Sequence, residues 1–298
     1  MAESLEQYLA VRVVLVDEAL GRFLPGLGGI RQSLHKAMHY SVFAGGKRLR
    51  PVLMIAAAEA VGGDAQQVMH AACAMEMLHT YSLIHDDLPA MDDDDFRRGR
   101  PTNHKVFGEA HAILAGDALL TEAFRLLADS KANADVAPEV SLRIIEIMGR
   151  YAGSQGMVGG QVVDMESEGQ EIDLPTLEYI HTHKTGALIL ASIQIGALLA
   201  GAEKAQFEAL TRFGEAAGLA FQVADDILDV VGESDELGKN AGSDQARGKA
   251  TYPALLGLAQ SKERATALCA QAVNALDGFG AEADPLRDIA QYIVQRNS

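Results

Sequence analysis

Two clusters of aspartates are the residues of this sequence best suited to chemistry. The first, Asp86–Asp95, holds six aspartates, and the second, Asp225–Asp229, holds three. Each lies at or near the end of an otherwise apolar helical segment. Like charges at this density destabilise a helix unless a counter-charge is present, and oxygen-only ligands select a hard cation such as Mg²⁺. Either cluster alone is ordinarily a solvated acidic turn, but the two together indicate a metal site.

The spacing within each cluster indicates how its carboxylates converge. Asp225 and Asp229 are four residues apart and therefore share one helix face. Asp86 and Asp92 are six apart, which places them on different faces of a regular helix. Pro89 has no N–H for the carbonyl of His85 and clashes with it, so we expect the helix to break near Asp87. The chain can then return Asp92 to the side of Asp86.

Basic residues gather beside these clusters although the chain is acidic overall. Arginine offers a fork of donors and lysine a point charge, and phosphate recognition uses both. The sequence therefore predicts an anion shared between metal and bases, although each basic segment alone is more often a solvated loop. A P-loop nucleotide motif is not present, which argues against that enzyme class. The basic residues lie in four places: Gly45–Pro51, Arg97–Pro101, Lys184–Gly186 and Gly238–Pro253.

A few further residues could face the same space. His79 lies two helical turns before Asp86, and Phe221 and Gln222 lie about one turn before Asp225. A lone histidine or phenylalanine on an apolar helix is more often part of the core, so these assignments are weaker. Neither cysteine has a base arranged beside it in the sequence for nucleophilic work. His181 and His183 are two residues apart and therefore lie on different faces of a helix, so we assign them no zinc site.

The elements that must position these residues are helical. Apolar residues recur with helical spacing along almost the whole chain, and we find no alternating strand pattern longer than about four residues. No linker or composition shift divides the sequence, so we expect a single domain over residues 1–298, an all-α bundle of roughly ten helices. The expected helices cover about residues 5–21, 30–40, 51–61, 65–87, 109–128, 139–153, 203–231, 252–276 and 285–296, and another starts at Pro175.

The 18 residues from Thr185 to Ala202 carry no charge, which meets the lower length for a membrane helix. Ser192, Gln194 and three glycines interrupt the apolar character, and a helix that is apolar on all sides can equally be buried in a bundle. We therefore expect a central helix and no membrane span. Acidic residues stand where a signal peptide would be basic, and we expect a cytoplasmic protein.

Composition excludes several partners. The chain has 41 acidic and 25 basic residues, a formal charge of −16, which argues against nucleic acid and against an anionic membrane surface. Hydrophobic residues make up 48%, so the chain is not an acidic disordered one. Aromatic residues are only 5%, with no tryptophan, and this favours helix over sheet.

In these motifs the sequence resembles the trans-isoprenyl diphosphate synthases, most closely the bacterial farnesyl diphosphate synthase (geranyltranstransferase) branch. The resemblance covers nearly the whole chain. It implies the isoprenoid synthase fold, a helical bundle around a deep central cavity, usually as a homodimer. The landmarks are GGKRLRP at 45–51, HTYSLIHDDLPAMDDDDFRRGRPTNH at 79–104, HKTGAL at 183–188, FQVADDILDVVG at 221–232 and LGKNAGSDQARGKATYPALLGL at 237–258.

The resemblance also implies a role for each candidate residue. Three Mg²⁺ ions, with Mn²⁺ as an alternative, would bind the diphosphate of an allylic substrate through Asp86, Asp87, Asp92, Asp225, Asp226 and Asp229. The same diphosphate would contact Arg97, Lys184 and Lys239, and these three, with Asp86, Asp92 and Asp225, would be the catalytic residues. Isopentenyl diphosphate would bind through Lys47, Arg50, His79 and Arg98. The allylic carbons would lie along Thr185, Phe221 and Gln222, and Tyr81 with Ser82 would limit the chain length.

The implied reaction is ionisation of dimethylallyl or geranyl diphosphate, condensation with isopentenyl diphosphate and loss of a proton. We expect (2E,6E)-farnesyl diphosphate as product, because Tyr81 is bulky; packing of Tyr81 against a neighbouring helix is the alternative to a chain-length role. A geranyl or geranylgeranyl diphosphate synthase is the alternative on the same scaffold. A class I terpene cyclase would not need the bases Lys47, Arg50 and Arg98. A non-catalytic subunit would be expected to lose one acidic cluster, and a simple acidic metal-binding protein leaves the basic loops unexplained.

Overall fold

The computed structural model describes residues 4–231 and 250–295, and these residues are almost wholly helical. The chain divides into two compact units. The first comprises Met1–Ile55 and Ala65–Ile145, and the second comprises Ala56–Asp64 and Glu146–Ser298. Each unit is described below by itself.

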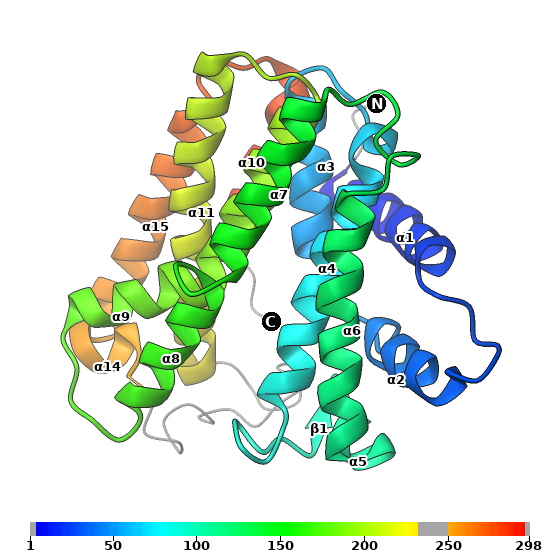
Figure 1. Ribbon diagram of the computed structural model, residues 1–298. Helices are drawn as coiled ribbons and strands as arrows, with labels where there is room; N and C mark the ends of the chain where they lie inside the picture. The colour runs from blue at the N-terminus through cyan, green and yellow to red at the C-terminus, as the bar shows by residue number, and fades with distance from the viewer. Residues whose placement is uncertain (1–3, 232–249, 296–298) are drawn as a thin grey trace. The chain divides into compact units, whose positions relative to one another are not determined.

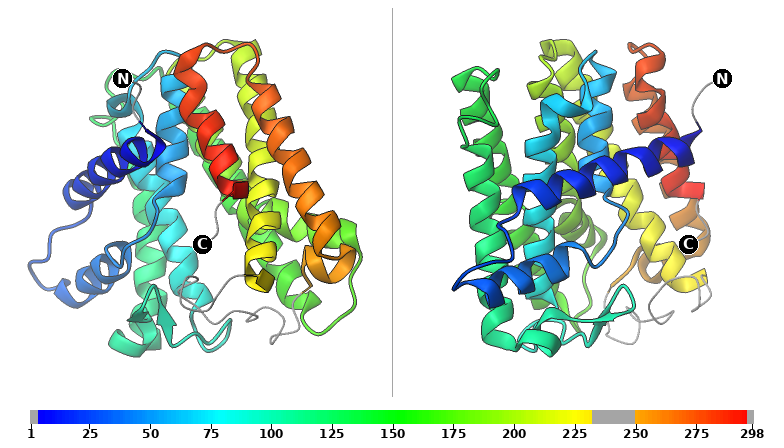
Figure 2. Two further views of the ribbon diagram at one scale, coloured as in Figure 1. Left: turned by 180° about the vertical axis from the view of Figure 1, so that it is seen from behind. Right: turned by 90° about the vertical axis from the view of Figure 1, so that its right-hand side faces the viewer.

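The first unit is built on two long helices that lie side by side, α4 and α6 (Figure 1). Helices α2 and α5 pack against α6, while α1 crosses α4 instead of running parallel to it (Figure 2). A two-residue antiparallel hairpin, β1 with β2, follows α4. The elements are α1 (Leu5–Phe23), α2 (Gln32–Val42), the start of α3 (Leu49–Ala60), α4 (Ala65–Asp86), β1 (Phe96–Arg97), β2 (Arg100–Pro101), α5 (Asn103–Phe107), α6 (Glu109–Leu127) and the start of α7 (Pro138–Ala152).

The second unit is organised around the longest helix, α11, which lies beside α15 and α10. The C-terminal helix α16 packs against both α11 and α15, as the view from behind shows (Figure 2). Its further elements are α8 (Met157–Ser167), α9 (Leu174–Ile180), a π-helical turn η1 (His181–Gly186), α10 (Ala187–Leu199), α11 (Lys204–Val231), α14 (Tyr252–Leu256), α15 (Leu258–Ala275), η2 (Ala281–Ala283) and α16 (Asp284–Gln295).

Local sequence signals explain where several helices begin. Ser4 caps α1, since its side chain and that of Gln7 form a reciprocal capping box. The Asp173 side chain accepts a hydrogen bond from the Thr176 N–H at the start of α9, with Pro175 in the first turn as predicted. Gly257, with a φ of +79°, splits the expected helix 252–276 into α14 and α15.

The all-α prediction is confirmed, and each predicted helical segment is helical in the described residues. The helix α8 and the short α5 were missed. In α8 two glycines, Gly159 and Gly160, weaken the helical pattern. The single-domain extent and the central cavity stay predictions.

The uncharged segment 185–202 begins inside η1 and continues as α10, where Leu188, Ser192 and Ile195 are fully buried. The segment is therefore a buried helix, as expected, and its central place in a bundle stays a prediction. Across the described residues, none of the helices combines the length and the hydropathy that crossing a bilayer requires.

Candidate functional site

The first aspartate cluster lies where α4 ends and the chain folds back. The Asp92 N–H donates to the Asp86 carbonyl at 2.9 Å, and the Asp93 N–H donates to the Leu88 carbonyl at 3.1 Å. Pro89 stands inside this turn, where it cannot continue the helical ladder. The predicted break near Asp87 and the return of the Asp92 backbone to Asp86 are both confirmed.

Asp87 is held by Arg97 from the hairpin. The Asp87 side chain is almost completely buried, its Oδ1 accepts a hydrogen bond from Nε of Arg97 at 2.7 Å, and Nη2 of Arg97 lies 2.7 Å from the same oxygen. Burial raises the pKa of Asp87, and the Arg97 guanidinium opposes that rise. Arg97 also approaches Asp94 at 3.8 Å. The structure thus joins a predicted metal ligand and a predicted diphosphate ligand in one ion pair.

The hairpin turn presents Arg98. Arg97 pairs with Arg100, so Arg98 and Gly99 form a two-residue turn, and both have positive φ values, +53° and +72°. Such turns match the twist of a hairpin but favour glycine or asparagine at both positions. The Arg98 guanidinium donates to the carbonyl of Gly45 and lies against Gly46, where a Cβ would collide with it. The two basic segments 45–51 and 97–101 therefore meet.

His79 and Arg50 also meet in the first unit. Nη1 of Arg50 lies 3.2 Å from Nε2 of His79. Burial and the neighbouring arginines, Arg50 first, hold the pKa of His79 well below its ordinary 6.5. The imidazole is consequently neutral at physiological pH, and Nε2 can accept the hydrogen bond from Arg50. Lys47 is exposed in the loop that precedes α3.

Arg48, which stands between Lys47 and Arg50, has a structural role instead. Its side chain is buried, pairs with Glu76 at 2.7 Å and with Asp17 at 2.8 Å, and donates to the Val42 carbonyl. This arrangement fixes the backbone between Lys47 and Arg50. Arg48 is not among the residues predicted to bind substrate, and its contacts agree with that prediction.

Tyr81 and Ser82 lie on α4 ahead of Asp86. Tyr81 is 7% exposed, burial raises the pKa of its phenol to about 12, and its ring meets His85 edge-on at 5.6 Å. The Ser82 hydroxyl donates to the His79 carbonyl at 2.8 Å. The role of these two residues in chain length stays a prediction.

In the second unit, a cavity of about 140 Å³ collects four of the predicted residues. Its walls come from α8, α9, η1, α11 and the start of α14. Asp225 and Phe221 are half-buried on α11, and Asp229 is buried. The predicted residues in the wall are Lys184, Thr185, Gln222 and Asp226, and they are joined by Asp164, His181 and Thr251.

Asp226 is fixed by two hydrogen bonds to one oxygen. Its Oδ2 lies 2.9 Å from Nε2 of His181 and accepts the backbone N–H of Tyr252 at 2.9 Å. Tyr252 in turn donates its hydroxyl to Glu178 at 2.9 Å, and Arg264 donates to the same glutamate oxygen. These contacts orient the predicted ligand. His181, considered in the sequence only as a zinc ligand and rejected, and Tyr252 and Glu178, not selected there, are thus positioning residues that spacing along the chain does not reveal.

Lys184 is placed by the helix that the sequence analysis missed. Its Nζ lies 2.7 Å from Oδ2 of Asp164 on α8. Gly160, one turn earlier on α8, touches the backbone of His183 and Lys184, where a Cβ has no room. Lys184 itself belongs to the π-helical turn η1, a local geometry that is frequent at functional sites. Lys239, the remaining predicted diphosphate ligand, lies outside the described residues.

Residues 31–279 match the model of the polyprenyl synthetase family, and the chain belongs to this family. The resemblance seen in the sequence motifs is confirmed. The chain is 53% identical over 261 residues to farnesyl diphosphate synthase of Geobacillus stearothermophilus, a match that covers 88% of this chain and 87% of that protein. It is 49% identical over 297 residues to large subunit 1 of the heterodimeric chloroplastic geranylgeranyl pyrophosphate synthase of Arabidopsis thaliana, which covers 98% and 79%.

Comparison with solved structures supports the same family. The chain superposes on an apo FPP/GFPP synthase from Zymomonas mobilis with a TM-score of 0.87 and 40% identity, covering 99% of this chain and 100% of that one.

Proposed function

We propose that this protein is a prenyltransferase that condenses isopentenyl diphosphate with dimethylallyl and then geranyl diphosphate to give (2E,6E)-farnesyl diphosphate. The observation that carries the proposal is the placement of bases beside both acidic clusters in a chain of charge −16. Arg97 pairs with Asp87 in the first unit, and Lys184 shares a cavity wall with Asp226 in the second. Such pairs of opposite charge suit an anion held jointly by cations and bases.

The donor chemistry of both clusters fits magnesium. Asp86, Asp87 and Asp92 in the first unit, and Asp225, Asp226 and Asp229 in the second, offer carboxylate oxygens, the donor that Mg²⁺ prefers. Three Mg²⁺ ions per active site are proposed, with Mn²⁺ as the alternative. Bound there, the metal would supply Lewis-acid stabilisation of the charge that develops on the leaving diphosphate.

Side chains of the protein would bind and orient the two diphosphate substrates. Arg97, Lys184 and Lys239 would hold the allylic diphosphate and stabilise its negative charge as the carbon–oxygen bond breaks. Lys47, Arg50, His79 and Arg98 would orient isopentenyl diphosphate, so that its double bond meets the allylic cation. Neutral His79 and Arg50 already lie within hydrogen-bond distance, which positions the guanidinium before substrate arrives. Condensation leaves a carbocation on the former isopentenyl unit, and a proton lost from the adjacent carbon would pass to the departed diphosphate as the new double bond forms.

Thr185, Phe221 and Gln222 would line the allylic carbons and keep water from the cation. Tyr81, buried one turn before Asp86, would close the space for a longer chain, and a C15 product is therefore proposed. Geranylgeranyl diphosphate synthesis is the second candidate, since the chain is also about half identical to enzymes of that name. Assembly as a homodimer and a cytoplasmic location are proposed on the family resemblance.

The test is a product assay on the purified protein. It is incubated with Mg²⁺, labelled isopentenyl diphosphate and geranyl diphosphate, and the products are sized by chromatography after dephosphorylation. A C15 alcohol as the main product supports the proposal, and a main C20 product selects the second candidate. A cyclic hydrocarbon formed without isopentenyl diphosphate identifies a cyclase, and the absence of any product contradicts catalysis altogether.

A further inference from the structure

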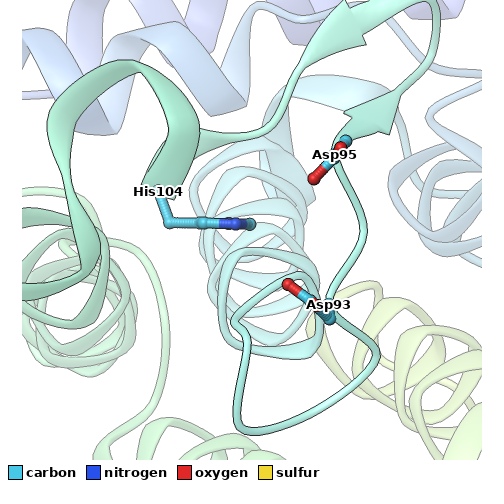
Figure 3. Close-up of side chains that lie close together, drawn as sticks. All are labelled: Asp93, Asp95 and His104. Carbon is cyan, nitrogen blue, oxygen red and sulfur yellow. The ribbon is translucent and has the colours of Figure 1, made fainter.

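The first aspartate cluster contains a second group of ligands, separate from those considered so far. Asp93, Asp95 and His104 each bring a potential ligand atom within 4.8 Å of the others. Figure 3 shows the three side chains converging, with the imidazole of His104 directed toward the space between the two carboxylates. Asp93 and Asp95 belong to the first acidic cluster but are not among the six aspartates named individually as magnesium ligands, and His104 is the residue that ends the landmark motif 79–104.

The hairpin brings this group together from its two ends. Phe96 pairs with Pro101, so Asp95 and Thr102 face each other just beyond the last strand pair. The Thr102 N–H donates to the Asp95 carbonyl at 3.0 Å, and its hydroxyl donates to the Asp94 carbonyl at 2.8 Å. The left-handed φ of Asp93, +51°, turns the chain immediately before. The fold therefore holds the acidic segment against the start of α5 by backbone contacts.

His104 supplies independent evidence for a ligand. The residue is only 7% exposed, and its Nδ1 lies 3.1 Å from the Thr102 hydroxyl. Its Nε2 is buried and makes no hydrogen bond to any described residue. A buried polar atom without a partner costs free energy, which a coordinated cation would recover. The hydroxyl on the opposite ring nitrogen is the outer contact that commonly orients a metal-binding histidine.

We propose that Asp93, Asp95 and His104 bind a divalent transition-metal ion, of the Zn²⁺ type, at the base of the hairpin. The imidazole nitrogen distinguishes this site from the all-oxygen clusters, because imidazole ligands suit zinc and its neighbours whereas carboxylates alone suit magnesium. Asp95 also pairs with Lys105 at 2.6 Å through Oδ1, and the second carboxylate oxygen can coordinate. The ion would tie residues 93–95 to α5 and so fix both ends of the hairpin that carries Arg97 and Arg98.

Cobalt binding tests the site without substrates, so the outcome does not depend on the proposed catalytic function. Chelator-treated protein is titrated with Co²⁺ in millimolar Mg²⁺, which occupies the oxygen-only clusters, and the visible absorption of bound Co²⁺ is followed. We expect one equivalent of Co²⁺ to bind and excess Zn²⁺ to displace it, because an imidazole ligand suits zinc. Loss of the signal at millimolar Mg²⁺ would overturn the proposal.

Three variants locate the ion. His104→Gln and Asp93→Asn should each weaken Co²⁺ binding at least about tenfold, and Asp93 is exposed, so its replacement leaves the core untouched. His111→Gln, an exposed histidine on α6, is the matched control and should bind as the unchanged protein does. Zn²⁺ should also raise the thermal midpoint of the unchanged protein but not of Asp93→Asn. Unchanged Co²⁺ affinity in both His104→Gln and Asp93→Asn would refute the site.

Discussion

Replacing Gly160 by alanine should disable Lys184 without touching any charged group. A Cβ at Gly160 would come closest to the backbone nitrogen of Lys184, and would lie 2.8 Å from both the His183 carbonyl carbon and Lys184 Cα, whereas ordinary contacts are 3.4–4 Å. These neighbours are backbone atoms that cannot rotate away, so α8 and η1 must separate by roughly 1 Å. Overpacking of this kind lowers the free energy of unfolding by about 1–3 kcal/mol.

The same displacement moves Lys184 relative to its partner. Asp164 sits on α8, one turn beyond Gly160, so the 2.7 Å contact between Asp164 and Lys184 lengthens when the helices part. A misplacement of about 1 Å can cost on the order of 10²-fold in rate. We expect kcat/KM for geranyl diphosphate to fall by about that factor, while KM for isopentenyl diphosphate changes little.

Steady-state kinetics with each diphosphate varied in turn, together with thermal unfolding, provide the measurement. Gly21→Ala is the matched control, because a Cβ on Gly21 in α1 meets nothing within 4 Å and alanine favours a helix. Its kinetics should be unchanged and its stability equal or higher. Native kinetics and a native unfolding midpoint in Gly160→Ala would show that the contact between α8 and η1 does not position Lys184.

Three other predictions concern single residues. Asp86→Ala or Asp225→Ala should lower turnover at least about a hundredfold at saturating Mg²⁺ while circular dichroism stays native, since loss of one metal ligand removes a few kcal/mol of transition-state stabilisation; retention of most activity would contradict the ligand assignment. Tyr81→Ala should give products longer than C15, as measured by chromatography. An unchanged C15 product would show that another residue limits the chain length. The folded-state pKa of His79 lies below its ordinary 6.5. Between these two pKa values the unfolded chain therefore binds more protons than the folded protein. The stability that this histidine contributes is complete above pH 6.5 and is lost as the pH falls toward the folded-state pKa. The free energy of unfolding, measured by denaturant titration at each pH, should therefore fall more steeply below pH 6.5 in the unchanged protein than in His79→Gln. An equal dependence on pH in the two proteins would contradict the lowered pKa of His79.

The first unit shows what local chemistry can predict. The break after α4 follows from Pro89 alone, because a proline removes a donor and clashes with the preceding turn wherever it stands. The return of Asp92 to Asp86 then needs only a short loop, and the structure has that contact. In the second unit, Asp225 and Asp229 both lie on α11, four residues apart, as the helical pattern predicted.

The second unit shows what the sequence could not reveal. Asp226 meets His181 from 45 positions away and Tyr252 from 26 positions away, and no periodicity records such pairs. The helix that supplies Asp164 was hidden, because glycines that permit close packing also lower helical propensity. The residues that position a site come from tertiary packing, whereas the residues that do its chemistry stand out by type.

The π-helical turn at His181–Gly186 has a consequence for insertions and deletions in this segment. Deleting Thr182 would allow a regular α-helix into α10, with its stronger hydrogen-bond ladder. It would also rotate His181 by about 100° relative to Lys184, one residue step of an α-helix. His181 would then leave Asp226, so a more regular helix would come with a misaligned aspartate. The length of this segment is therefore expected to be more constrained than its composition, and natural variation here should consist of substitutions, with gaps avoided.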